Sequence, residues 1–234
     1  MKSPIILHIE TSTNVCSVAL SEGADCLFNI SNADGMNHAK MLSVFINEAL
    51  QVLKPQSKTL DAVAVSSGPG SYTGLRIGIS TAKGLCYGYD IPLIAVNTLE
   101  IMTVSALKQI QNIENKATTL FCPMIDARRM EVYAEFFNAD RTLYREVSAD
   151  IISENSYEEI LEKYKVYFFG NGSDKCKPVI THKNAHFIDE IVPLAENMID
   201  SAVQKFHLKQ FEDTAYFEPF YLKEFQTTVP KVKV

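Results

Sequence analysis

Two short polar segments have the residue types that hold a phosphate or a magnesium ion. Glu10-Thr11-Ser12-Thr13 follows a strand predicted over residues 4–10, and Asp126-Ala127-Arg128-Arg129 follows another predicted over 118–126. Carboxylates and hydroxyls at such turns can bind magnesium and nucleotide phosphates. The candidate nucleotide-binding residues, expected to face one cleft, are Glu10, Thr11, Ser12 and Asp126. The same residue types are also ordinary turn formers, so the two interpretations stay open.

A glycine-rich loop offers a second possible phosphate site. Ser67-Gly68-Pro69-Gly70-Ser71 lies between a predicted strand (61–66) and a predicted helix (72–89). Free backbone amides at a helix start can hold an anion. The loop lacks the Gly-Lys-Ser/Thr of a P-loop, and its serines do not lie in Gly-x-Ser-x-Gly. The sequence therefore predicts neither a P-loop nor a serine hydrolase.

The helix after this loop contains four glycines, each of which costs about 1 kcal/mol relative to alanine. Gly74, Gly78 and Ala82 recur every four residues and form a groove that lets another helix approach closely. A helix predicted over 38–54 has an apolar face wider than a surface helix needs. Both features indicate helix packing, either inside the lobe or with a partner.

The two closest histidines do not predict a metal site. His182 and His186 have a spacing that would place both on one helix face, but their surroundings read as loop and strand. We therefore predict no metal and no other cofactor, and a polar packing role for His38.

Composition limits the class of protein. The 234 residues carry a net charge of −6, and the five cysteines include no Cys-x-x-Cys pair. Widely spaced, odd-numbered cysteines predict reduced thiols and a cytoplasmic protein. No signal peptide and no membrane span are predicted. The acidic balance opposes strong RNA binding by this chain alone, although residues 230–234 are locally basic.

The predicted elements alternate between strand and helix after an opening hairpin in each half. A hairpin and a third strand over 26–30 open the first half, followed by helices over 38–54, 72–89 and 98–109. The second half has strands over 118–126, 130–137 and 166–169, a capping box at Ser156 and Glu159, and a helix over 194–206. This pattern predicts an α/β protein with lobes 1–112 and 113–234, whose last helix and tail pack back on the first lobe.

Five segments together resemble a known family. They are Ile5 to Leu20, Gly68-Pro69-Gly70-Ser71-Tyr72-Thr73-Gly74-Leu75-Arg76-Ile77-Gly78, Ala95 to Glu100, Asp126 to Tyr133 and Pro219-x-Tyr221-Leu222-Lys223. In this order they resemble the TsaB (YeaZ) family, a component of the bacterial machinery that makes threonylcarbamoyladenosine in tRNA. The resemblance implies a two-lobed actin-like, sugar-kinase-like fold with ribonuclease-H-like lobes.

The resemblance also implies that the chain has lost the metal site of its catalytic paralogue. TsaD has His-Met-Glu-Gly-His where this chain has Thr98-Leu99-Glu100-Ile101-Met102. Thr98 and Met102 cannot replace imidazole as ligands for such a metal. Glu10 stands where the family commonly has Asp. We therefore expect a non-catalytic scaffold subunit; the alternatives are an ATP-binding enzyme of the same fold and a metallopeptidase, an older label of the family.

The family's partner interface is a four-helix bundle made by the first two helices. The resemblance predicts that the chain binds TsaD there, or itself as a homodimer, that the small ATPase TsaE joins, and that tRNA is met only indirectly. The expected interface residues are His38, Met41, Leu42, Phe45, Ile46, Tyr72, Gly74, Leu75, Gly78, Ile79 and Ala82. On this prediction Gly78→Leu abolishes the association and leaves the monomer folded.

Overall fold

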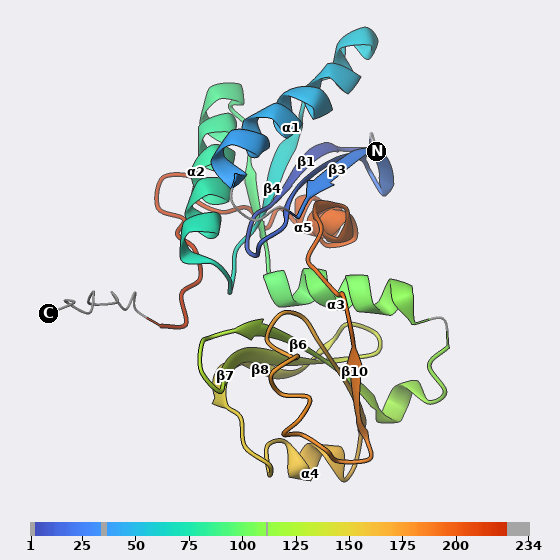
Figure 1. Ribbon diagram of the computed structural model, residues 1–234. Helices are drawn as coiled ribbons and strands as arrows, with labels where there is room; N and C mark the ends of the chain where they lie inside the picture. The colour runs from blue at the N-terminus through green and yellow to red at the C-terminus, as the bar shows by residue number, and fades with distance from the viewer. Residues whose placement is uncertain (1–2, 34–36, 111, 224–234) are drawn as a thin grey trace, which may run out of the picture.

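Two lobes, each built on a five-stranded sheet, lie one above the other in the computed structural model (Figure 1). The structure describes residues 3–33, 37–110 and 112–223. The first half of the chain contains β1 (Ile5–Glu10), β2 (Cys16–Glu22), β3 (Asp25–Asn32), α1 (His38–Leu53), η1 (Lys54–Gln56), β4 (Ala62–Ser66), α2 (Tyr72–Tyr89), β5 (Leu93–Val96) and α3 (Thr98–Gln109). The remaining elements are η2 (Lys116–Thr118), β6 (Thr119–Asp126), β7 (Glu131–Asn138), β8 (Leu143–Ile151), α4 (Glu158–Leu161), β9 (Lys165–Phe169), β10 (Ala185–Ile188), η3 (Ala195–Met198) and α5 (Ile199–His207).

The two sheets have the same topology. The strand order is β3-β2-β1-β4-β5 in one lobe and β8-β7-β6-β9-β10 in the other. In each, the first three strands form an antiparallel meander, the fourth pairs in parallel with the first, and the fifth pairs in parallel with the fourth. The predicted α/β class with two related lobes is confirmed. Within the described residues, no helix is long and apolar enough to cross a membrane.

The central strands of the first sheet are apolar because both of their faces are covered. Ile5, Leu7 and Ile9 of β1 belong to a core cluster with α1 and α2, whereas Ile6 faces the cluster that includes Met198. Strands buried on both faces have continuous apolar sequences rather than alternating ones. This explains why β1 and β4 are easily recognised in the sequence.

Helix α3 forms the layer between the two sheets (Figure 1). Ile101 belongs to the core of the first lobe, and Leu99, Met102 and Ala106 belong to a cluster with Phe121 and other residues of the second sheet. A helix that is apolar on opposite faces is buried on both. The two lobes therefore share a continuous apolar contact through α3.

The chain returns to the first lobe after the second sheet. Lys205 of α5 donates to the Ala95 carbonyl at 2.7 Å, and the Phe220 amide donates to the Ser67 carbonyl at 2.8 Å. Between these points Lys83 of α2 donates to the carbonyls of Ala215 and Phe217. In Figure 1 the described end of the chain runs beside α2.

The second lobe differs from the sequence prediction in two places: one strand is missing from the prediction, and one predicted helix cap is wrong. Strand β8 was not predicted, because it is an edge strand whose charged residues, including Arg145 and Asp150, hide the alternation. The capping box is absent as well: Tyr157 is the N-cap residue of α4, and Ser156 Oγ instead accepts a hydrogen bond from the Ser153 amide.

The glycines of α2 divide into two kinds. A Cβ on Gly74 would collide with the Thr11 carbonyl oxygen, and one on Gly78 would collide with Thr11 Oγ1. A Cβ on Gly84 would meet no atom within 4 Å. The first two glycines therefore allow α2 to lie directly against the β1–β2 turn, and the third is an exposed helix glycine.

This division predicts opposite effects of one substitution on stability. Gly78→Ala should lower the free energy of unfolding by about 1–3 kcal/mol, because its methyl group overlaps Thr11. Gly84→Ala should raise it by about 1 kcal/mol, because alanine is the better helix former in open space. Urea denaturation of the two variants and the wild type measures both; equal effects would contradict the packing described for α2.

Candidate functional site

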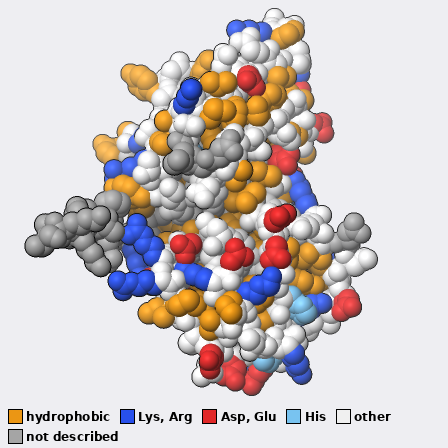
Figure 2. All heavy atoms as spheres, in the orientation of Figure 1, with side chains coloured by type: hydrophobic (Ala, Val, Ile, Leu, Met, Phe, Trp, Pro, Cys, Tyr) orange, Lys and Arg blue, Asp and Glu red, His pale blue; other side chains and the backbone are white. Residues whose placement is uncertain are grey.

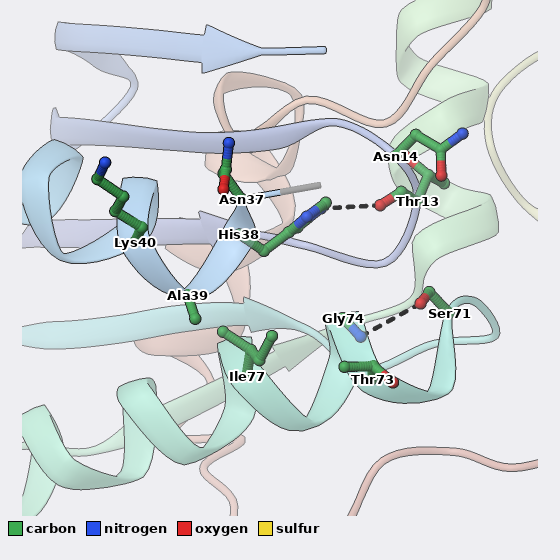
Figure 3. Close-up of a pocket in the computed structure, with 10 residues that line it drawn as sticks. All are labelled: Thr13, Asn14, Asn37, His38, Ala39, Lys40, Ser71, Thr73, Gly74 and Ile77. Carbon is green, nitrogen blue, oxygen red and sulfur yellow. Dashed lines mark hydrogen bonds between the residues drawn. The ribbon is translucent and has the colours of Figure 1, made fainter. Parts of the chain in front are cut away.

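A cavity of about 320 Å³ opens where the first two helices begin (Figure 3). Helix α1 begins at His38 and α2 at Tyr72, and the β1–β2 turn forms a third wall. The lining residues are Thr13, Asn14, Asn37, His38, Ala39, Lys40, Ser71, Thr73, Gly74 and Ile77. Most of these are polar or small, so the cavity is not an apolar ligand pocket.

Hydrogen bonds between the walls fix the shape of this cavity. The His38 Nε2–H donates to the Thr13 carbonyl at 2.9 Å, which ties the start of α1 to the turn (Figure 3). Ser71 caps α2 by accepting from the Gly74 amide at 3.2 Å. The polar contact predicted for His38 is confirmed.

Glu10 lies beneath the turn, fully enclosed in the first lobe. Its Oε1 accepts from the Ser12 amide at 2.5 Å, and its Oε2 has no hydrogen-bond partner among the described residues. Burial raises the pKa of the Glu10 carboxyl to about 7, although the hydrogen bond from the Ser12 amide opposes the shift. Glu10 is therefore only partly charged at neutral pH.

Asp126 lies in a different environment from Glu10. It is exposed at the end of β6, where its carboxylate pairs with Lys175 and its amide donates to Asn171 Oδ1 at 2.9 Å. Neither Asp126 nor Glu10 lines the cavity at the helix starts. The expectation of one cleft faced by both carboxylates is wrong, since one is buried in the first lobe and the other is exposed and ion-paired on the second.

The positions of the paralogue's metal ligands are part of the core here. Thr98 and Met102 are fully buried, and the Met102 methyl group occupies the space that a Cβ on Gly170 would need. The described residues contain no group of three His, Cys, Asp or Glu that could hold a metal ion. His182 and His186 lie in a turn and in β10, not on a helix.

Most of the predicted interface residues are inside the monomer. The buried members are Leu42, Phe45, Ile46, Gly74, Leu75, Gly78, Ile79 and Ala82. The interpretation of Gly74 and Gly78 as an open docking groove is wrong, because Thr11 already fills it. Gly78→Leu would therefore disrupt the lobe itself rather than only an association. His38, Met41 and Tyr72 are half-buried, so their role in an interface stays a prediction.

The surface of the two helices is formed by other residues. Val44 of α1 is 45% exposed, and Lys40 lies one turn before it. Thr73 and Ile77, one turn apart on α2, line the same cavity as Lys40. We call these four residues the α1–α2 surface. The sequence signal for it was present, since Val44 lies outside the buried face of α1.

The chain is similar to known proteins over most of its length. A family model described as TsaD, tRNA N6-adenosine threonylcarbamoyltransferase, matches residues 32–210. The chain therefore belongs to this family, in its TsaB (YeaZ) branch. A tRNA threonylcarbamoyladenosine biosynthesis protein TsaB from Haemophilus influenzae is 29% identical, with 95% of each chain covered. A protein of the same name from Buchnera aphidicola subsp. Schizaphis graminum is 30% identical, covering 75% of this chain and 82% of that protein.

A solved structure shows the same fold. It is an uncharacterized protein from Pseudomonas aeruginosa with similarity to peptidase YeaZ, and it superposes with a TM-score of 0.74 at 21% identity. The match covers 94% of this chain and all of the other. The two-lobed fold expected for the TsaB branch is therefore the one that this chain adopts.

The buried Glu10 carboxyl predicts a pH dependence of stability. Its pKa in the folded chain, about 7, lies above the ordinary 4.5. The protonated form therefore contributes stability that is complete below pH 4.5 and is lost as the pH rises through 7. For the wild type this loss between pH 5 and pH 8 should be about 3 kcal/mol. Glu10→Gln, which cannot ionise, should lack it.

Chemical denaturation of both proteins at the two pH values measures this difference. Other titrating groups, including buried His8, whose pKa burial lowers to about 3, cancel in the comparison. Glu48→Gln, on the exposed side of α1, controls for the loss of a surface charge. If Glu10→Gln loses as much stability as the wild type between pH 5 and pH 8, Glu10 is not the buried acid described here.

Proposed function

We propose that this chain is a non-catalytic subunit in the biosynthesis of tRNA threonylcarbamoyladenosine. It binds a catalytic TsaD-like paralogue through the α1–α2 surface and stabilises it. A small TsaE-like ATPase joins the same complex. The observation that carries the proposal is the core-filling pair Thr98 and Met102 in a chain that matches the transferase family over most of its length.

The enclosed positions of Thr98 and Met102 support a role without metal chemistry. A metal site needs ligands that converge on an open position, which a substrate or water can reach. Here Met102 packs against Gly170 and belongs to the apolar cluster between the lobes. Restoring a metal site would require more than two histidines, because the space itself is filled by the contact between α3 and the second sheet.

The α1–α2 surface supports binding to a paralogue. Figure 2 shows hydrophobic side chains (orange) among the exposed atoms of the upper lobe, in the region of α1. Val44 is the most exposed aliphatic side chain of that helix, and Ile77 lies across the cavity from its first turn. Two related proteins that each present a helix pair with such residues can pack ridges into grooves as a four-helix bundle.

The surface predicts the effect of one exposed substitution. Val44→Glu should weaken binding of a co-expressed TsaD-like paralogue by about tenfold or more, since a carboxylate would be buried in the bundle. Pull-down through a tag on the paralogue, followed by titration of the purified proteins, measures the loss. The melting temperature should stay close to that of the wild type, because Val44 is not part of the core.

Ile151→Glu is the matched control. Ile151 is an aliphatic, β-branched residue that is 77% exposed at the end of β8 in the second lobe. Its substitution should leave binding of the paralogue unchanged. Equal retention of the paralogue by all three proteins would remove the α1–α2 surface from the proposal. Size-exclusion chromatography of the chain alone reports whether Val44→Glu also breaks a homodimer.

The competing function is an ATP-binding enzyme of the same fold. Calorimetric titration of the purified chain with Mg-ATP, together with metal analysis, addresses it directly. Tight binding with turnover, or one metal ion per chain, would overturn the non-catalytic assignment. Binding of the paralogue without either result would support it.

A further inference from the structure

The turn between β6 and β7 holds two arginines in an unfavourable backbone conformation. Arg128 has φ of 69° and Arg129 has φ of 49°, and both side chains are exposed. The turn is closed by the Glu131 amide, which donates to the Arg128 carbonyl at 3.1 Å. Neither arginine forms an ion pair with any residue that the structure describes.

Such a turn is usually made by other residues. The left-handed region suits glycine and asparagine, and a long side chain with a Cβ is strained there. A local rule that is broken without a structural gain is expected mainly at functional sites. Within the described part of the chain, neither arginine has an ion pair that would offset this strain.

Other cations lie beside this turn. Lys223, on the returning C-terminal segment, forms an ion pair with Glu131 at 2.5 Å, and Lys175 donates to the Glu131 carbonyl at 2.6 Å. Burial raises the pKa of the Tyr133 hydroxyl, and the positive charges of Lys223 and Arg128 oppose that rise. The basic residues therefore come from both the second lobe and the returning segment.

Aromatic rings continue the surface onto the first lobe. Tyr221 packs against Tyr72 with ring centroids 5.0 Å apart, and Arg76 lies over the Tyr72 ring while its Nε donates to the Tyr221 hydroxyl. Phe220 is 44% exposed next to them. Aromatic faces interleaved with arginines are the usual surface on which single-stranded bases stack.

We call this surface the arginine-turn patch and define it by its cations and rings. Its members are Arg76, Arg128, Arg129, Lys175, Lys223, Tyr72, Phe220 and Tyr221. The cations outnumber the neighbouring carboxylates, Asp126, Glu131 and Glu218, although the whole chain has a net charge of −6. In Figure 2, lysine and arginine side chains (blue) lie at the level between the two lobes, beside aspartate and glutamate side chains (red).

We infer that the arginine-turn patch binds RNA directly, with Arg128 and Arg129 on backbone phosphates and an unpaired base on the rings beside Arg76. The identification of this RNA as tRNA rests on the proposed function. The acidic balance opposed strong RNA binding by this chain alone, and the resemblance led to the expectation that tRNA is met only indirectly. Phosphate contacts, however, depend on the local charge around the binding site rather than on the net charge of the chain. In the arginine-turn patch several cations lie close together.

An acidic protein is the other class of partner for such a charge. The exposed Phe220 ring favours RNA, because an unpaired base can stack on it whereas an acidic peptide has no use for such a ring. The strained turn also fits phosphates, since it holds two exposed arginines in succession, neither of which pairs with a carboxylate among the described residues. The test below includes an acidic polypeptide so that the two classes are separated.

The experiment measures RNA binding by the purified chain and by the complex with its paralogue. The protein is titrated into a fluorescently labelled, unmodified anticodon stem-loop, and binding is followed by fluorescence anisotropy. The titration is repeated at several salt concentrations, starting at about 50 mM. The variant is Arg128→Asn/Arg129→Gly, which suits the backbone and removes both charges. We expect affinity to fall about tenfold and the slope of log K against log salt to shrink by about 1.4, for two lost phosphate contacts on a single strand.

Two controls make the result specific. Arg141→Gly removes an exposed arginine with φ of 71° from the β7–β8 turn and should leave RNA binding unchanged. Arg128→Lys/Arg129→Lys keeps the charge and should retain most of the affinity. The Asn/Gly variant should also melt at a higher temperature than the wild type, so its loss of binding cannot come from unfolding.

Several outcomes would overturn the inference. They are absence of RNA binding by the wild type in both forms, an unchanged affinity and salt slope in the Asn/Gly variant, and binding of poly-glutamate as tight as that of the stem-loop. These outcomes are distinct from failure of the proposed function, which would show as loss of the TsaD-like paralogue in the pull-down while the RNA titration is unaffected.

Discussion

The contact between Thr11 and helix α2 is the constraint on which the first lobe depends. The Thr11 hydroxyl donates to the Gly74 carbonyl at 2.8 Å, and Gly74 and Gly78 have no side chain, so the helix lies directly against the β1–β2 turn. Close approach of this kind requires glycine, and the loss of helix propensity is offset by the packing that it allows. The same contact sets where α1 and α2 begin relative to each other. It thereby shapes the cavity at their starts and decides which side chains of the two helices face outward.

The second organising feature is the apolar layer between the lobes. Helix α3 joins two sheets of identical strand order, and Met102 fills the space beside Gly170 where the two halves meet. The returning segment joins the lobes a second time, from Ser67 on the first to Glu131 on the second. These contacts favour a rigid protein that presents surfaces, in agreement with the role proposed for it.

The sequence predicted most of the fold because the central strands are continuous apolar runs and the long helices have clear periodicity. It failed where local patterns are weak. Strand β8 is a charged edge strand, and α4 is a single turn whose cap is a tyrosine rather than the serine of the expected box. The glycines at 74 and 78 were correctly expected to allow close packing, but the sequence could not say that the neighbour is Thr11 of the same chain. Most of the predicted interface residues are therefore buried inside the folded chain, and Val44 and its neighbours form the exposed surface of the two helices instead.

By itself the sequence determined the class of the fold, its two halves and the family, because each of these depends on residue types and spacing along the chain. Only the tertiary structure decided which residues are accessible. It enclosed Glu10 while exposing Asp126, and it brought Lys223 beside the arginine turn across more than ninety residues of sequence. Such choices depend on long-range packing, since burial and charge neighbours are properties of the folded chain. A net charge of −6 for the whole chain gives no indication of a surface on which several cations lie close together.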